Sequence, residues 1–396
     1  MKRWRQGFLV AAFAVSFAGP GLGQAAFDPE IQRSFVEGAR LLDAGDYEAA
    51  ARTFRGLLQR TNSPRVKLEL ARTLFFLKQY PESRALFKEV QLEPDIPWQV
   101  RDNIDRFVQN IDDILGYVRF SVSVVGDSNP RNITSQREFT IGGVRLTFQP
   151  PEDNKRVTGL RYGVQAYQPI LREARVAGYF TGSYLDYPTS DLDRLTVDGG
   201  LVKEFGSEAG PRARAGIEAG TFGNKRLYDF PYLGYVHPLS RSALHNVNAE
   251  LKVGKVNFPH FRFLDATYGS VGLSAFRVLS RTVAVSLGGT LEDSRAREEP
   301  YSYYGLTVAP GIAWLITEPA LLVRAELGFG ERRYGAVDPL FGEKRLDRRT
   351  RLDFSVRSKQ WRWMNFTPAL VVSLDRTRSN IGFYSYDKVN VSIALE

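Results

Sequence analysis

From Tyr117 onward, apolar residues recur at every second position along successive stretches of the chain. In residues 246–253, for example, Asn, Asn, Glu and Lys alternate with Val, Ala, Leu and Val. A period of two is that of a β-strand with one dry face and one polar face. The pattern alone fits two folds: a soluble sandwich, whose charges face outward, or an outer-membrane barrel, whose lumen-facing side chains are polar.

The connections between these stretches favour the barrel. Short turns at 240–242, 279–281 and 317–319 alternate with longer connections at 222–230, 257–264, 292–301 and 331–347. Outer-membrane barrels have tight periplasmic turns, longer external loops and girdles of aromatic residues at both membrane interfaces. The strand ends carry aromatic residues that fit such girdles: Tyr184, Tyr187, Phe222, Tyr232, Trp314, Trp361, Trp363 and Phe366.

Fourteen strands follow from the alternation. They lie near 117–127, 157–168, 174–187, 193–205, 211–223, 231–240, 243–256, 266–279, 282–293, 302–315, 320–333, 348–359, 364–377 and 384–395. An even number of strands places both ends of the barrel on the periplasmic side. Residues 139–148 also alternate and would make a fifteenth strand. We assign them to the first external loop or to a piece folded into the lumen.

Residues 27 to about 114 have the period of helices instead. Gly38, Gly45-Asp46-Tyr47, Ala50 and Phe54 recur 33 residues later as Ala71, Gln79-Tyr80, Ser83 and Phe87. This spacing resembles the tetratricopeptide (TPR) repeat of about 34 residues, in which small residues let paired helices approach closely. Residues 97–115 predict a third, capping helix. A TPR domain binds a peptide or protein, whereas a purely structural helical bundle is the alternative.

The first 25 residues predict an export signal. Three basic residues precede an apolar run from Phe8 to Ala18, and small residues follow near Ala25, where we expect cleavage. The predicted domains are therefore the signal (1–25), a TPR-like domain (26–115) and a barrel (116–396). No later segment has the ~20 consecutive apolar residues of a membrane helix.

Composition argues against Cys- or His-based catalysis and metal binding, and against nucleic acid as a partner. The net charge of +9 falls to 50 − 44 = +6 without the basic residues of the signal. The chain has no Cys and three His, which excludes thiolate nucleophiles and makes His-based metal sites and triads improbable. We therefore expect no enzyme activity, cofactor or metal. The pairs Asp191 with Asp193 and Glu298 with Glu299 lack calcium-loop spacing, so solvated loop acids are the favoured interpretation.

The polar face of the strands supplies candidate residues for contact with a transported client. They carry both signs, whereas a simple ion-selective porin concentrates one sign at its constriction. Salt bridges that brace the barrel and a polar path for a protein both remain open. The candidates are Arg161, Gln165, Asp198, Arg212, Arg214, Glu218, Asn246, Asn248, Glu250, Lys252, Arg324, Glu326, Arg351, Asp353 and Arg357.

Two short motifs at the first and last strands complete the pattern. The first is Asp127, Ser128 and Asn129, and the second comprises Ser379, Asn380, Tyr384, Tyr386 and Asp387. With the signal, the TPR-like domain and the fourteen strands, they resemble the surface lipoprotein assembly modulator (Slam) family. The resemblance covers essentially the whole mature chain. The chain departs from outer-membrane barrels in ending Ala394-Leu395-Glu396 rather than in an aromatic residue.

The resemblance implies an outer-membrane translocator of a Gram-negative bacterium with its helical domain in the periplasm. Its client would be a surface lipoprotein or a small secreted haem- or metal-binding protein, and its other partners outer-membrane lipid and the barrel-insertion machinery. The alternative is a passive or substrate-selective channel with a periplasmic accessory domain. A third interpretation is a surface-exposed structural or adhesive protein that uses the loop at 331–347.

Overall fold

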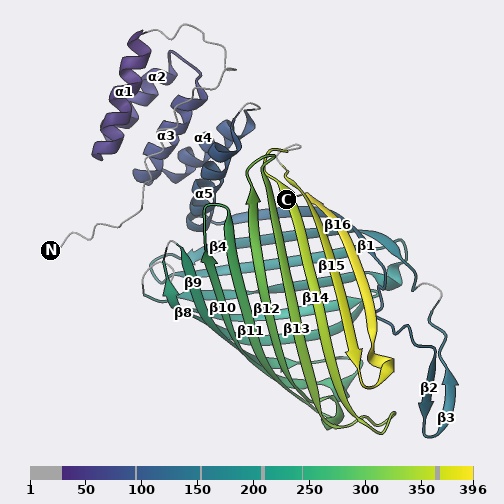
Figure 1. The fold of residues 1–396 in the computed structure, drawn as a ribbon. Helices are drawn as coiled ribbons and strands as arrows, with labels where there is room; N and C mark the ends of the chain where they lie inside the picture. The colour runs from purple at the N-terminus through teal and green to yellow at the C-terminus, as the bar shows by residue number, and fades with distance from the viewer. Residues whose placement is uncertain are drawn as a thin grey trace. The chain divides into compact units, whose positions relative to one another are not determined.

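A computed structural model describes residues 29–93, 96–151, 154–206, 210–242, 244–361 and 366–395 (Figure 1). The chain forms two compact units that divide between Val90 and Gln91. The predicted signal segment and Trp363 lie outside the described residues, so the structure does not test them. Across the described ranges, none of the helices has the length and apolar character needed to span a membrane.

The first unit consists of helical hairpins with the predicted 33-residue offset. Its helices are α1 (Pro29–Ala44), α2 (Tyr47–Leu58), α3 (Pro64–Phe76) and the start of α4 (Tyr80–Leu92). The chain turns through a left-handed residue after each first helix, at Gly45 (φ 81°) and at Lys78 (φ 61°). The Asp46 side chain then accepts a hydrogen bond from Ala49 N (3.1 Å) and caps α2. The predicted repeat therefore forms.

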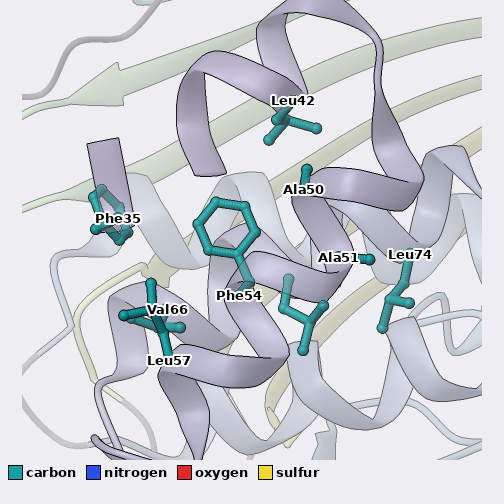
Figure 2. Close-up of a cluster of buried hydrophobic side chains, with 9 residues drawn as sticks. Phe35, Leu42, Ala50, Ala51, Phe54, Leu57, Val66 and Leu74 are labelled. Carbon is teal, nitrogen blue, oxygen red and sulfur yellow. The ribbon is translucent and has the colours of Figure 1, made fainter. Parts of the chain in front are cut away.

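The centre of this unit shows why the repeat needs small and aromatic residues at these positions. Phe54 is completely buried beside Phe35, with a ring-centroid distance of 5.9 Å (Figure 2). A Cβ atom on Gly38 would lie 2.8 Å from the Phe54 ring, so only glycine fits there. In the second hairpin, buried Ser83 donates from Oγ to the carbonyl of Ala71 at 2.7 Å. Close helix packing thus depends on these residues.

Replacing Phe54 with alanine is expected to destabilise the helical unit by about 3–5 kcal/mol, because it leaves a cavity in a fully packed core. Limited proteolysis of the full chain at increasing urea measures this. Phe76→Ala is the control: Phe76 is partly exposed and should give a loss below about 2 kcal/mol. Equal protease resistance of Phe54→Ala and the native chain would contradict the assigned core.

The second unit begins with α5 (Trp98–Leu115) and continues into a closed antiparallel barrel, which within the described residues has the fourteen predicted strands. The strands are β1 (Tyr117–Asp127), β4 (Val157–Leu171), β5 (Val176–Asp186), β6 (Arg194–Glu204), β7 (Arg212–Phe222), β8 (Lys225–Arg241), β9 (His245–Val256), β10 (Ala266–Val278), β11 (Val283–Ala296), β12 (Tyr303–Ile316), β13 (Leu321–Val337), β14 (Lys344–Ser358), β15 (Pro368–Ser379) and β16 (Tyr386–Leu395). Each strand pairs with its sequence neighbour, and β1 closes the barrel on β16.

The outer wall of the barrel is apolar. Outward side chains such as Phe120, Ile217 and Ile393 are more than half exposed, and their strand neighbours in sequence point into the lumen. Since the sheet closes on itself and presents an apolar face outward, the soluble sandwich is excluded. Residues 139–148 form a separate hairpin of β2 (Glu138–Ile141) and β3 (Val144–Thr147), in the connection from β1 to β4. They are part of the first loop rather than of the barrel wall.

Two of the long connections predicted from the sequence are wrong. The connection at 222–230 is a two-residue turn, since β8 begins at Lys225; Gly223 (φ 55°) and Asn224 (φ 59°) have the left-handed conformation that such hairpins require. The connection at 331–347 shrinks to 338–343, because β13 continues to Val337 and β14 begins at Lys344. In both places the strands continue beyond the apolar band, where polar and apolar residues no longer alternate regularly.

Helix α5 is held on the rim of the barrel near β1. Its Asp102 forms an ion pair with Lys359, in the connection between β14 and β15, and its Asp112 pairs with Arg119 of β1 at 3.4 Å. Gly116 joins helix and strand at φ 94°, where a side chain would collide with the carbonyl of Tyr167 on β4. These contacts place α5 at the barrel end that also holds Leu395.

Candidate functional site at the barrel seam

The seam between β1 and β16 has a short ladder. It extends from the pair Val122–Leu395 to the pair Asp127–Asn390, six residue pairs. The adjoining ladders have eleven pairs (β1 with β4) and ten pairs (β15 with β16). Within the described residues, the stretch Tyr117–Ser121 pairs with β4 alone. The seam is therefore held by fewer backbone hydrogen bonds than its neighbours, and its unpaired part lies at the α5 end.

The two sequence motifs meet at the opposite end of this seam. Ser128 N donates to the carbonyl of Val389 (3.0 Å), and Val389 N donates to Ser128 Oγ (2.8 Å). Asn129 Nδ2 donates to the carbonyl of Asp387 (3.1 Å). Segments more than 250 residues apart are thus joined side by side, as Figure 1 shows for β1 and the yellow β16.

A buried ion pair closes the same end. Lys388 Nζ lies 2.8 Å from Asp127 Oδ2, and the two side chains are only 8% and 3% exposed. The Tyr187 hydroxyl also donates to Asp127 Oδ2 at 3.0 Å. Burial and the neighbouring carboxylate raise the pKa of Tyr187 above its ordinary value, which keeps the hydroxyl protonated as a donor. Asp127 therefore joins β16 to the residue that follows β5.

Asp193 continues this network away from the seam. It accepts hydrogen bonds from the Tyr184 hydroxyl and from Tyr187 N, both at 2.9 Å, and it is buried. Leu192 packs beside it in a small core with Val125. The expectation of a solvated loop acid is wrong for Asp193. The prediction of an interfacial girdle is wrong for Tyr187, because its ring is buried at the barrel end.

The second motif holds the connection between β15 and β16 against the start of β14 and the connection that precedes it. Asn380 accepts from Leu346 N (2.7 Å) through Oδ1 and donates to the carbonyl of Lys344 (2.9 Å) through Nδ2. The Tyr384 hydroxyl donates to Asp338 (2.7 Å), and burial and this carboxylate raise the pKa of Tyr384. Ser379 Oγ accepts from Ile381 N, while Tyr386 pairs with Thr377 in the ladder.

The loop that follows β1 also reaches over to the β16 side. Thr134 Oγ1 donates to the carbonyl of Gly382 at 3.0 Å. Phe139, at the start of the β2–β3 hairpin, packs against Phe383 and Phe341 with ring-centroid distances of 5.4 and 6.4 Å. The end of the seam away from α5 is thus held by backbone pairing, a buried ion pair and an aromatic cluster. At the α5 end, the described residues of β1 and β16 have no backbone pairing beyond the pair Val122–Leu395.

The lumen candidates occupy inward positions, and several pair with one another. On one wall, Asp198 accepts from the Tyr232 hydroxyl (2.9 Å), so Tyr232 faces the lumen and the prediction that it belongs to a girdle is wrong. Glu218 accepts from the Tyr228 hydroxyl (2.6 Å) and lies 3.5 Å from Lys252 Nζ. The sequence pattern did not point to Tyr228, which lay in a predicted loop.

The opposite wall has its own pairs. Arg351 and Asp353 form an ion pair at 2.6 Å. A cavity of about 450 Å³ lies beside them, and its lining includes Arg324, Glu326, Asp353 and Arg357. The other candidates lie on inward positions of further strands: Arg161, Gln165, Arg212, Arg214, Asn246, Asn248 and Glu250. In the described part of the chain, no three acidic or His side chains gather as a metal site.

Comparisons with known proteins agree with both parts of the chain. The family "Surface lipoprotein assembly modifier" matches residues 237–396, and the tetratricopeptide repeat family matches residues 41–95. No protein of curated function matches the chain.

Similar solved structures include an outer-membrane protein, OmpT of Vibrio cholerae, and the proteins OccAB3 and OccK10. A loop L8 deletion mutant of OmpT from Vibrio cholerae has a TM-score of 0.38 and 9% identity, covering 71% of this chain and 99% of that one. OccAB3 of Acinetobacter baumannii has a TM-score of 0.40 and 9% identity, and the match covers 71% of this chain and 98% of OccAB3. OccK10 of Pseudomonas aeruginosa has a TM-score of 0.36 and 10% identity, and the match covers 71% of this chain and 98% of OccK10.

Proposed function

Since the chain is a Slam-like outer-membrane barrel with an N-terminal TPR-like domain, we propose that it delivers a protein client from the periplasm to the cell surface. The client is a surface lipoprotein or a small secreted haem- or metal-binding protein. The TPR-like domain of residues 26–115 lies in the periplasm and captures the client. The barrel of residues 116–396 then conducts it outward without covalent chemistry.

The short β1–β16 ladder carries this proposal. A lipoprotein has acyl chains that belong in lipid and a polypeptide that belongs in a polar path. A seam that parts would connect the polar lumen to the bilayer, so that both parts of the client cross together. Each backbone hydrogen bond contributes about 0.5–1.5 kcal/mol, and a six-pair ladder therefore parts more readily than the neighbouring ladders of ten and eleven pairs.

The two ends of the seam suggest where it opens. Asp127, Lys388 and Asn129 hold the end away from α5, while Tyr117–Ser121 at the α5 end pair with β4 alone among the described residues. We therefore infer that a client enters at the α5 end. The inward polar residues, including Glu218, Lys252 and Asp353, then supply mixed-charge contacts along the lumen.

Deleting the gene tests the function directly. The deletion strain should lose surface display of its client lipoproteins, measured as accessibility to protease and antibody on whole cells, and a plasmid copy of the gene should restore it. Total client protein in lysates is the control, because a transport defect leaves synthesis intact. Normal display in the deletion strain would contradict the proposal.

A passive channel with an accessory domain is the competing function. Planar-bilayer recordings of the purified chain separate the two functions. The translocator should show a small or unstable conductance, because its paired lumen charges brace the walls. A stable large conductance that persists after deletion of residues 27–114 would favour the channel.

A further inference from the structure

On the outward face of β13–β16, six charged side chains near the strand ends away from α5 are joined by hydrogen bonds between arginines and acids. They are Glu331 and Arg333 on β13, Arg348 on β14, Arg376 and Arg378 on β15, and Asp387 on β16. The strand register places Arg348 between Glu331 and Arg378, and it places Arg376 opposite Asp387. The six residues form one surface across four adjacent strands, which we name the outer arginine cluster.

The outer arginine cluster continues the apolar wall of the barrel. Positions two apart on a strand share a face. Phe329, two positions from Glu331, is 50% exposed, and Leu374, two positions from Arg376, is 42% exposed. The cluster therefore lies at the border of the surface that contacts lipid, and its side chains do not face the lumen.

Each carboxylate in the cluster is shared by two arginines. Glu331 accepts from Arg333 Nε (2.7 Å) on one oxygen and from Arg348 Nε (3.1 Å) on the other. Asp387 likewise accepts from Arg376 Nε (2.9 Å) and from Arg378 Nη2 (2.8 Å). Four arginines and two acids give a net charge of +2. The two carboxylates thus hold four guanidinium groups in place without neutralising them.

The guanidinium groups remain open to a ligand from outside. The four arginine side chains are between 49% and 76% exposed. Each guanidinium has five N–H donors in a planar fork that matches phosphate oxygens. Ordinary exposed ion pairs contribute little to stability. On β11, which β12 separates from the cluster, the outward pair of Arg295 with Asp293 has one charge of each sign. The outer arginine cluster differs from such a pair because it has two arginines for each acid.

We propose that the outer arginine cluster binds the phosphate groups of a phosphorylated lipid in the outer leaflet of the membrane. The choice of leaflet rests on the proposed topology, with α5 on the periplasmic side. Basic side chains next to an apolar membrane surface attract anionic headgroups, and Arg forms bidentate bonds to phosphate. Because β15 and β16 carry part of the cluster, the bound lipid lies beside the seam.

Binding of purified lipid A to the full chain in detergent tests the proposal by native mass spectrometry. The double variant R348Q/R378Q removes two arginines but neither acid. It should bind lipid A at least tenfold more weakly, as roughly fivefold is expected per arginine. Arg295→Gln is the matched control, with an equally outward and exposed arginine, and its lipid A binding should stay within about twofold of the native chain.

Three further measurements identify the group that is bound and check that the variants are folded. Lipid A without its phosphates should bind as weakly to the native chain as lipid A binds to the double variant. Inorganic phosphate at the concentration of the lipid should leave lipid A binding unchanged. The electrophoretic mobility of unheated samples should show that every variant is folded.

Other outcomes would overturn the proposal. They are equal lipid A binding by the double variant, an equal loss in Arg295→Gln, retained binding of the dephosphorylated lipid, or complete displacement by inorganic phosphate. Displacement of lipid A by an acidic client protein that binds with higher affinity would assign the cluster to protein instead. Surface display of the client is not a readout in these experiments, so failure here leaves the translocator function standing.

Discussion

A disulfide bond between β1 and β16 should abolish surface display of the client while the barrel stays folded. Val124 and Ile393 are paired in the ladder, and cross-strand partners lie at Cα separations that a disulfide can span. The chain has no Cys of its own, so the variant V124C/I393C offers one pair of thiols. If the client leaves through the seam, a covalent bond across it blocks transport. Whole-cell protease accessibility of the client measures the effect.

The matched control uses the same residue of β16. In L370C/I393C, Ile393 is linked to its partner on β15 instead of to β1, so the barrel is cross-linked but the seam is free. This control should display the client normally, and a reducing agent should restore display to the seam-locked variant. Normal display with a fully oxidised seam would show that the client does not pass between β1 and β16.

Asp127→Asn should destabilise the barrel by about 3–5 kcal/mol, because it leaves the buried ammonium group of Lys388 without its ion-pair partner. The Tyr187 hydroxyl would also lose the carboxylate that accepts its hydrogen bond. The measurement is the urea concentration at which the purified chain in detergent loses its folded electrophoretic mobility. We expect the loss to appear first as exposure of the β1–β16 end, detectable as faster amide exchange in Ser128 and Asn129.

Asp293→Asn is the control for Asp127→Asn. Asp293 also pairs with a basic residue, Arg295, but both side chains are exposed, and exposed pairs contribute at most about 1 kcal/mol. The two variants make the same chemical change in a buried and in an exposed pair. Equal stability of Asp127→Asn and the native chain would mean that the Lys388 ion pair does not hold the seam.

The fold could be predicted where the signal is local. The repeat at Gly38, Phe54 and Ser83 is read within single hairpins, and alternation marks each barrel strand by its own residues. The prediction failed at 225–230 and 334–337, where the strands extend past the apolar band and apolar residues no longer occupy every second position. Alternation depends on a contrast between lipid and water, and that contrast ends at the membrane border.

The candidate site was only partly predictable, because its contacts join distant segments. The motif residues Asp127, Asn129 and Asp387 were identified, but Lys388 and Tyr187, the two partners of Asp127, were not. Lys388 lies more than 250 residues from Asp127, and Tyr187 lies 60 residues away. Tyr187 sits at a strand end like any girdle residue, and nothing in the adjacent sequence shows that its ring turns inward. Only strand register brings these groups together.

The junction at Gly116 has a mechanical consequence. The chain passes from α5 into Tyr117 with no intervening loop, and α5 is tied to the rim at Asp102 and Asp112. Tension applied to the N-terminal part of the chain therefore acts first on the Asp102 contact beside β14 and then, through the backbone at Gly116, on β1. It reaches β1 at the stretch Tyr117–Ser121, which pairs with β4 alone in the described residues. Of all the strands, β1 is the one on which a pulled client would act directly.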